Sequence, residues 1–130
     1  MENKKTIIMS IHPEYAHLIL NNKKKYEYRR NRCKSDVEKI LIYSTRPESL
    51  IIGEVQVKAI ISGPPIDIWD KTSKYSGISK NKFLEYFRYT NIAYAYCLGK
   101  ATVYDSPITL GDLGINKAPQ SYVYMPQLTV

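Results

Sequence analysis

The run "IIGEVQVKAIIS", residues 51–62, constrains the fold more than any other part of this chain. β-Branched residues dominate it, and apolar and polar side chains alternate with the period of two that is typical of a strand with one buried face. The alternation predicts inward positions at Val55, Val57, Ala59 and Ile61, and outward positions at Glu54, Gln56 and Lys58. A sheet must therefore form the core, and other segments must supply the remaining strands.

Further strands are expected at residues 6–11, 24–30, 40–44, 92–105 and 121–125. One helix should begin at Pro13, because proline is favoured in a first helical turn, and another should follow an N-cap at Ser79. A short helix is expected in the proline-broken segment 63–77. Because helices do not alternate regularly with strands, we expect an α+β fold, a small mixed β-barrel of about five to six strands with two to three short helices. A length of 130 residues suits one domain, residues 1–130.

Positive charge is concentrated in "NNKKKYEYRRNRCK", residues 21–34. This run holds seven of the 19 Lys and Arg residues and one acid, Glu27, in a chain whose net charge is +7. Such a patch is the usual electrostatic footprint of a polyanion partner, a class that includes RNA and DNA. The alternative is that the charge only maintains solubility.

Other classes of site and location receive no support from the sequence. Cys33 and Cys97 are far apart, and His12 and His17 lack a metal-binding context, so neither a metal nor a cofactor is expected. No segment has the length of a membrane span, and the N-terminal apolar run is too short for a secretory signal. We therefore expect a cytoplasmic protein without a membrane partner, and the oligomeric state stays open.

The segment "SIHPEYAHLILNNKKKYEYRR" resembles the signature of the ASCH domain, a branch of the PUA-like superfamily. The matching positions are Ser10, Ile11, Pro13, Tyr15, Ala16, Lys24, Glu27 and Arg29. Asn22 stands where the family usually has glycine. Blocks at residues 40–57, 68–87, 93–110 and 118–125 are similar to those of short bacterial and phage ASCH proteins, so the resemblance covers nearly the whole chain. It implies a PUA-like barrel with a cleft beside the first helix, which in the family is predicted to bind RNA or a nucleotide.

The resemblance leaves two main classes of function open, and a third alternative, a transcriptional cofactor that binds protein, would require an exposed apolar patch that sequence alone does not show. One is a binding domain that regulates transcription or translation. The other is a hydrolase, because some small family members remove an acyl group from modified cytidine with a lysine, a threonine and a glutamate elsewhere in the chain. Lys24 keeps the lysine, but Glu27 occupies the threonine position, and a carboxylate does not replace a hydroxyl nucleophile. An amidohydrolase or ribonuclease would use Lys24 as base or electrostatic stabiliser and Glu27 as general acid or base.

The candidate ligand contacts follow from the resemblance, together with strand geometry and loop position. Glu27 and Arg29 are two residues apart on one strand, so both side chains should emerge on one face, roughly 6 to 7 Å apart. They either converge with Lys24 on a ligand or form a structural ion pair. Tyr26 or Tyr28 is a candidate for stacking on a base. The candidates for nonspecific phosphate contacts are Lys23, Lys25, Arg30, Arg32 and Lys34. The full nucleotide-binding set is Ser10, Lys24, Glu27, Arg29, Arg30, Trp69, Gln120 and Ser121.

Overall fold

The computed structural model describes residues 4–125. Its elements, in chain order, are β1 (Lys5–Ile11), α1 (Pro13–Leu20), β2 (Tyr26–Arg29), β3 (Val37–Ser44), β4 (Leu50–Gly63), α2 (Pro65–Thr72), the 3₁₀ turn η1 (Ser73–Tyr75), α3 (Lys80–Tyr86), β5 (Ala93–Ile108), the 3₁₀ turn η2 (Gly111–Leu113) and β6 (Tyr122–Tyr124). Each strand and helix expected from the sequence is present, although several boundaries differ by a few residues. None of the helices in the described part of the chain is long and apolar enough to cross a membrane.

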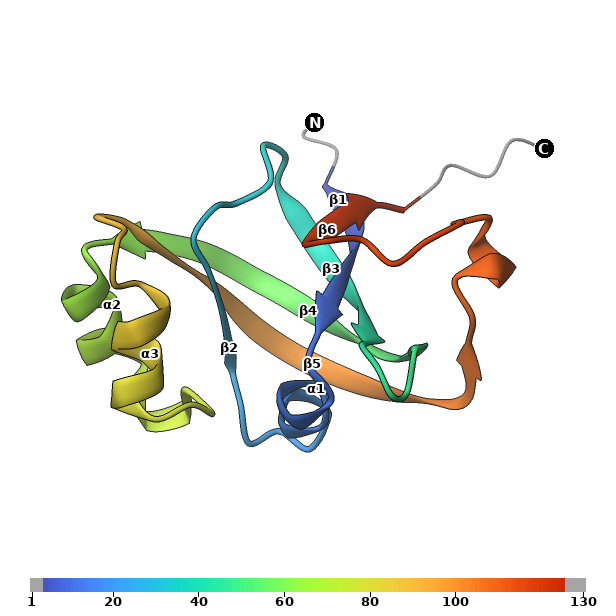
Figure 1. Ribbon diagram of the computed structural model, residues 1–130, viewed down its shortest axis with the longest axis horizontal. Coiled ribbons are helices and arrows are strands. Elements are labelled where there is room, and N and C mark those ends of the chain that lie inside the picture. The colour runs from blue at the N-terminus through green and yellow to red at the C-terminus, as the bar shows by residue number, and fades with distance from the viewer. Residues whose placement is uncertain (1–3, 126–130) are drawn as a thin grey trace.

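All six strands form one mixed sheet in the order β2-β5-β4-β3-β1-β6. Strands β1 and β3 are parallel, and the other neighbouring pairs are antiparallel. The long strands β4 and β5 bend along their length, so that the sheet curls into a half-barrel (Figure 1). The expected α+β class, with a mixed sheet of up to six strands and three short helices, is confirmed.

Helix α1 closes one end of the curled sheet. Pro13 starts it, and its residues Ala16, Ile19 and Leu20 are buried in the main core cluster with strands β1, β3, β4 and β5. Gly53 on β4 makes this packing possible, because a Cβ at that position would lie 2.7 Å from a Leu20 methyl carbon. The first helix is therefore held directly against the sheet, close to the end of β1.

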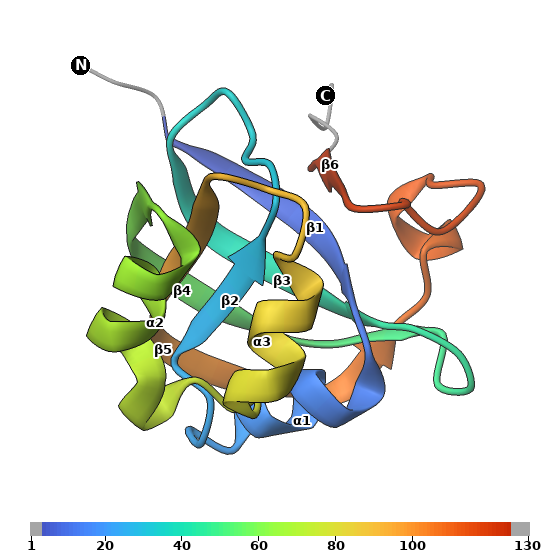
Figure 2. The same cartoon turned by 60° about the vertical axis from the view of Figure 1, so that its left-hand side comes forward.

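Helices α2 and α3 cover the sheet beside β2 and β5 (Figure 2). They form a second core cluster in which Phe83, Phe87 and Ile68 pack against Tyr28 and Ala95. Ser79 caps α3 as expected, since its Oγ accepts a hydrogen bond from the Lys82 amide at 3.2 Å. The predicted aromatic stripe of α3 is thus a core feature, and it fixes the position of α3 relative to β2.

One predicted side-chain orientation in β4 is wrong. Val55 and Val57 are buried as expected, but Ala59 is exposed. The register explains the difference, because Val57 pairs with Leu98 while Ala59 pairs with Cys97, so two steps on β4 match one step on β5. Such a β-bulge shifts the alternation of faces, and Ile60 packs against the main core instead.

Candidate functional site

A cleft of about 740 Å³ opens beside helix α1, at the end of the curled sheet. Its size lies within the range of about 300 to 1,000 Å³ typical of small-ligand sites. The lining residues are Ser10, Ile11, His12, Tyr15, Lys24, Glu27, Tyr28, Arg29, Tyr43, Thr45, Arg46, Ile78, Lys82, Glu85, Tyr86, Ala118, Pro119 and Gln120. We call residues 10–12, 43–46 and 118–120 the sheet wall, and residues 24–29 and 78–86 the helix wall.

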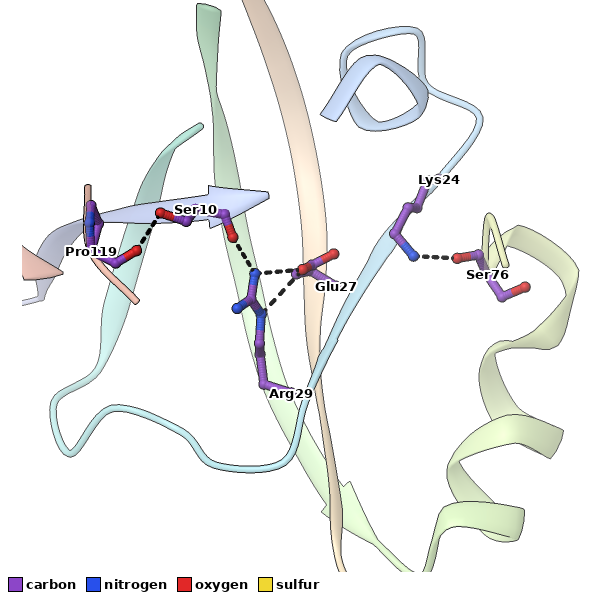
Figure 3. A network of polar contacts seen from close by, with 6 residues as sticks. All are labelled: Ser10, Lys24, Glu27, Arg29, Ser76 and Pro119. Carbon is purple, nitrogen blue, oxygen red and sulfur yellow. Dashed lines mark hydrogen bonds and ion pairs between the residues drawn. The ribbon is translucent and has the colours of Figure 1, made fainter. Parts of the chain in front are cut away.

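The parallel pairing of β1 and β3 builds the sheet wall. Ser10 pairs with Tyr43 and Ile11 with Ser44, so both strands end at the same edge and deliver their last residues to the cleft. The Ser10 hydroxyl then donates a hydrogen bond of 2.7 Å to the carbonyl of Pro119 (Figure 3). This bond holds the segment before β6 against the end of β1, which places Gln120 at the cleft.

Glu27 and Arg29 form an ion pair that also joins the two walls. Arg29 Nη2 lies 2.8 Å from Glu27 Oε2 and donates a second bond of 2.8 Å to the Ser10 carbonyl, and Arg29 Nε lies 3.2 Å from the same Oε2 (Figure 3). Within residues 4–125 no hydrogen bond reaches Glu27 Oε1. Glu27 and Arg29 therefore form the predicted ion pair and also lie with Lys24 at the same cleft. Glu27 Oε1 is left able to accept hydrogen bonds from a ligand.

Lys24 is a buried lysine that lines the cleft, with 3% of its surface exposed. Its Nζ donates a hydrogen bond of 2.6 Å to the Ser76 carbonyl (Figure 3) and lies 4.9 Å and 5.2 Å from the ring centroids of Tyr28 and Tyr15. Burial lowers the pKa of Lys24, because the ammonium loses hydration; the Glu27 carboxylate opposes this shift and the Arg29 guanidinium adds to it. Lys24 is thus poised to exchange a proton more readily than a surface lysine.

The aromatic rings of the cleft differ in what they can contact. Tyr28 is buried, its hydroxyl is 2.7 Å from Thr72 Oγ1, and burial raises the pKa of Tyr28 to about 12. Its ring is buried between Phe83 and the Lys24 ammonium, so it is not free to stack on a base. Tyr15 and Tyr86 are partly exposed and line the cleft, which makes them the better stacking candidates.

Five of the predicted site residues line the cleft: Ser10, Lys24, Glu27, Arg29 and Gln120. The other three lie elsewhere. Trp69 packs against Phe83, with ring centroids 5.0 Å apart, and Ser121 is exposed, its carbonyl accepting a bond from the Ser10 amide. Arg30 is exposed and stacks over the ring of Tyr86 at 4.3 Å, next to the cleft.

Several lining residues escaped the sequence reasoning. His12, Tyr43 and Arg46 belong to the sheet wall, and Lys82, Glu85 and Tyr86 belong to α3. Lys82 and Glu85 are three residues apart in a helix, a spacing that puts side chains on neighbouring positions of one face. The polar face of α3 could therefore have been predicted from the sequence. The residues of the sheet wall could not, because they come together only through the parallel pairing of β1 and β3.

The remaining cations of the basic run lie on the surface. Lys23, Lys25 and Lys34 are exposed, and Arg32 donates a bond of 2.9 Å to the Cys33 carbonyl. Among residues 4–125 no three His, Cys, Asp or Glu side chains are placed to hold a metal ion. Apart from the tyrosines, the ionisable and charged groups that line the cleft are those of Lys24, Lys82, Glu27, Glu85, Arg29, Arg46 and His12.

Comparison with known proteins identifies related sequences and folds. The model of the ASCH domain family matches residues 9–100. ATP synthase subunit alpha of Ureaplasma parvum is 32% identical over 123 residues, which make up 94% of this chain but only 15% of that protein. The ASCH domain-containing ribonuclease of Zymomonas mobilis is 31% identical over 97 residues, covering 74% of this chain and 66% of the relative. The chain thus spans only part of these relatives.

A solved structure shows the same architecture. The crystal structure of ASCH from Zymomonas mobilis superposes with a TM-score of 0.88 at 28% identity, over 96% of this chain and 90% of that one. The agreement extends over the curled sheet and its helices. It confirms the PUA-like α+β fold that the sequence resemblance implied.

Proposed function

The chain belongs to the ASCH domain family, and from this premise we propose that it binds single-stranded RNA and holds one nucleotide in the cleft. The observation that carries the proposal is that Lys24, Glu27 and Arg29, three residues of the family signature, line one cleft together. A relative of the same family, from Zymomonas mobilis, is a ribonuclease. RNA is therefore the substrate class we assign to the site.

The composition of the cleft suits an unpaired nucleotide. Tyr15 and Tyr86 offer ring faces on which a base can stack, and such stacking tolerates any base. Arg46 and Lys82 come from different walls and supply positive charge to the phosphates on either side. Arg30, packed on Tyr86, extends that charge beyond the cleft. The duplex form would keep its bases stacked and out of reach, so the single strand is preferred.

A second candidate function, cleavage of the bound RNA, is favoured by the presence of both Lys24 and Glu27 in the lining of the cleft. Glu27 Oε1 has no partner among residues 4–125 and can accept the proton of a ribose 2′-hydroxyl. The 2′-oxygen then forms a bond to the adjacent phosphorus, and the bond from phosphorus to the 5′-oxygen breaks. Lys24, whose pKa is lowered by burial, donates a proton to that leaving oxygen. The products are a 2′,3′-cyclic phosphate and a 5′-hydroxyl.

Cleavage of RNA explains the residue at position 27 better than deacylation of a modified cytidine. Deacylation by the known family members needs a hydroxyl nucleophile at that position, whereas Glu27 is a carboxylate held by Arg29. A carboxylate is a suitable general base for a 2′-hydroxyl. We therefore place the ribonuclease ahead of the amidohydrolase.

The test uses a labelled, unstructured RNA and a DNA of the same sequence, each at about 50 mM and 200 mM salt. We expect the RNA to bind more weakly at the higher salt, and a matched set of Lys24→Met, Glu27→Gln and Lys100→Met variants separates cleft effects from surface charge. Lys100 is exposed on β5 and does not line the cleft. Absence of RNA binding, or binding that Lys24→Met and Lys100→Met weaken equally, would overturn the proposal.

The proposed ribonuclease activity is tested separately, by the products and by a modified substrate. Products ending in a 2′,3′-cyclic phosphate, and resistance of a strand with 2′-deoxyribose at the cleaved position, support the 2′-hydroxyl mechanism. Glu27→Gln should then abolish cleavage while binding persists. If the parent protein binds RNA but forms no product, the RNA-binding proposal stands and the ribonuclease proposal is overturned.

A further inference from the structure

The side chain of Lys24 runs over the backbone of Gly77. A Cβ at position 77 would lie 2.6 Å from Lys24 Cβ and Cγ and 2.7 Å from Lys24 Cδ, distances that real Cβ atoms essentially never show. Gly77 also has a φ of +68°, which favours glycine. Both the space and the backbone conformation at this position therefore require a residue without a side chain.

The loop that carries Gly77 is fixed by its own hydrogen bonds. The Tyr75 carbonyl accepts a bond of 2.9 Å from the Lys25 amide, which ties the loop to the start of β2. Ser76 is buried, and its hydroxyl donates a bond of 2.9 Å to the Ile78 carbonyl. The Ser76 carbonyl is thus held where it accepts the 2.6 Å bond from Lys24 Nζ (Figure 3).

We propose that Gly77 is a positioning residue, which clamps the Lys24 side chain onto the Ser76 carbonyl and so fixes the ammonium group at the cleft. The importance of this clamp for RNA rests on the proposed function of Lys24. Its structural part does not, because the contact between Lys24 and residues 76–77 exists without any ligand. The clamp joins residues 52 positions apart in the chain.

A side chain at position 77 has a definite effect. It pushes the stem of Lys24 outward, so that Nζ leaves the Ser76 carbonyl and the rings of Tyr15 and Tyr28. The charged groups that face Lys24 are Glu27 and Arg29 from β2, and Lys82 and Glu85 of α3 line the same cleft. Because burial is the main cause of the lowered pKa of Lys24, release into water raises that pKa toward its ordinary value of 10.5.

The experiment compares Gly77→Ala and Gly77→Asn with the control Gly114→Asn. Asn tolerates a positive φ, so Gly77→Asn tests the lost space with little backbone strain. Gly114 has a φ of +74°, and a Cβ added there would meet no atom within 4 Å, so its substitution changes a similar backbone without touching Lys24. The pKa of Lys24 is read in each protein, without RNA, by NMR titration of its Nζ.

In the parent and in Gly114→Asn, Lys24 should titrate below the surface lysines. In both Gly77 variants its pKa should rise. RNA cleavage, where present, should fall at least about 100-fold in kcat with little change in KM, because a misplacement of even about an ångström can cost that much. An unchanged Lys24 titration in a folded Gly77→Asn protein overturns the clamp. If the Gly77 variants do not fold, a nuclear Overhauser effect between the Gly77 α-protons and the Lys24 side chain in the parent decides the matter, and its absence overturns the proposal.

The two proposals fail in distinguishable ways. Loss of the RNA function would appear as no binding or cleavage by the parent, whatever the Lys24 titration shows. Loss of the clamp would appear as an unchanged titration in Gly77→Asn, whatever the parent does with RNA.

Discussion

Arg29 and Ser10 belong to different walls of the cleft, and the guanidinium of Arg29 donates a hydrogen bond of 2.8 Å to the Ser10 carbonyl. The same guanidinium nitrogen lies 2.8 Å from the Glu27 carboxylate. Both side chains of the ion pair are largely buried, with 15% and 10% of their surfaces exposed. Arg29 therefore stabilises the fold in addition to any contact it makes with a ligand. Its removal should lower both stability and ligand binding.

Arg29→Ala should lower the free energy of unfolding by about 3 kcal/mol, because it leaves the Glu27 carboxylate buried without its partner. The matched control is Arg88→Ala, which removes an exposed ion pair with Glu85 and should cost less than about 0.5 kcal/mol. Urea denaturation of the three proteins measures both values. Equal losses in the two variants would contradict the view that burial makes the Glu27–Arg29 pair structural.

Lys24→Met should remove a component of the pH dependence of stability. The pKa of Lys24 is lowered in the folded protein, so between that pKa and 10.5 the unfolded chain binds more protons than the folded one. Stability contributed by this group therefore rises as the pH rises through that window and is absent below it. Denaturation measured across alkaline pH should show that the free energy of unfolding of the parent rises relative to that of Lys24→Met as the pH increases. A difference between the two proteins that does not change with pH would contradict this prediction.

Tyr28→Phe should cost about 1 kcal/mol at pH 7, because it removes the hydrogen bond between the Tyr28 hydroxyl and Thr72. The pKa of Tyr28 is raised to about 12 in the folded protein, against 10.0 ordinarily, so the stability from this group is complete below pH 10 and lost as the pH rises toward 12. The advantage of the parent over Tyr28→Phe should shrink in that range. A constant difference from pH 8 to pH 12 would show that Tyr28 titrates normally.

Lys82→Ala should weaken RNA binding and make it less sensitive to salt, because Lys82 lines the cleft. For single strands each phosphate contact adds about 0.7 to the slope of log affinity against log salt, so the slope should fall by about that amount. Lys100→Ala, an exposed lysine on β5 outside the cleft, is the matched control and should leave the slope unchanged. Equal slopes for both variants would remove Lys82 from the RNA contacts.

Local patterns were enough to predict the elements of this fold. Pro13 and Ser79 mark the starts of α1 and α3, and alternation of apolar residues reveals β4. The orientation of Ala59 could not be predicted, because a bulge arises from the pairing of β4 with β5 and leaves no mark on β4 alone.

The part of the site that local strand geometry could predict consists of residues close in sequence, and the family resemblance added Ser10 and Gln120. Lys24, Glu27 and Arg29 lie on or beside one strand, and all three reach the cleft. The partner of Lys24, the Ser76 carbonyl, is a backbone atom from a distant loop, and the sheet wall depends on the parallel pairing of β1 with β3. Trp69 was a candidate because it lies in the proline-broken segment, but a tryptophan there can equally serve the core, and its ring packs on Phe83.

The two walls of the cleft can be varied separately in protein engineering. The sheet wall comes from strand ends and from the segment 118–120, and it meets the helix wall at the bond between Arg29 and Ser10. Residues 45–46 and 118–120 of the sheet wall can therefore be randomised, and the resulting variants can be screened for altered base preference. Lys24, with the loop at residues 75–77 that holds it, and Glu27, held by Arg29, belong to the helix wall and stay constant throughout such a selection.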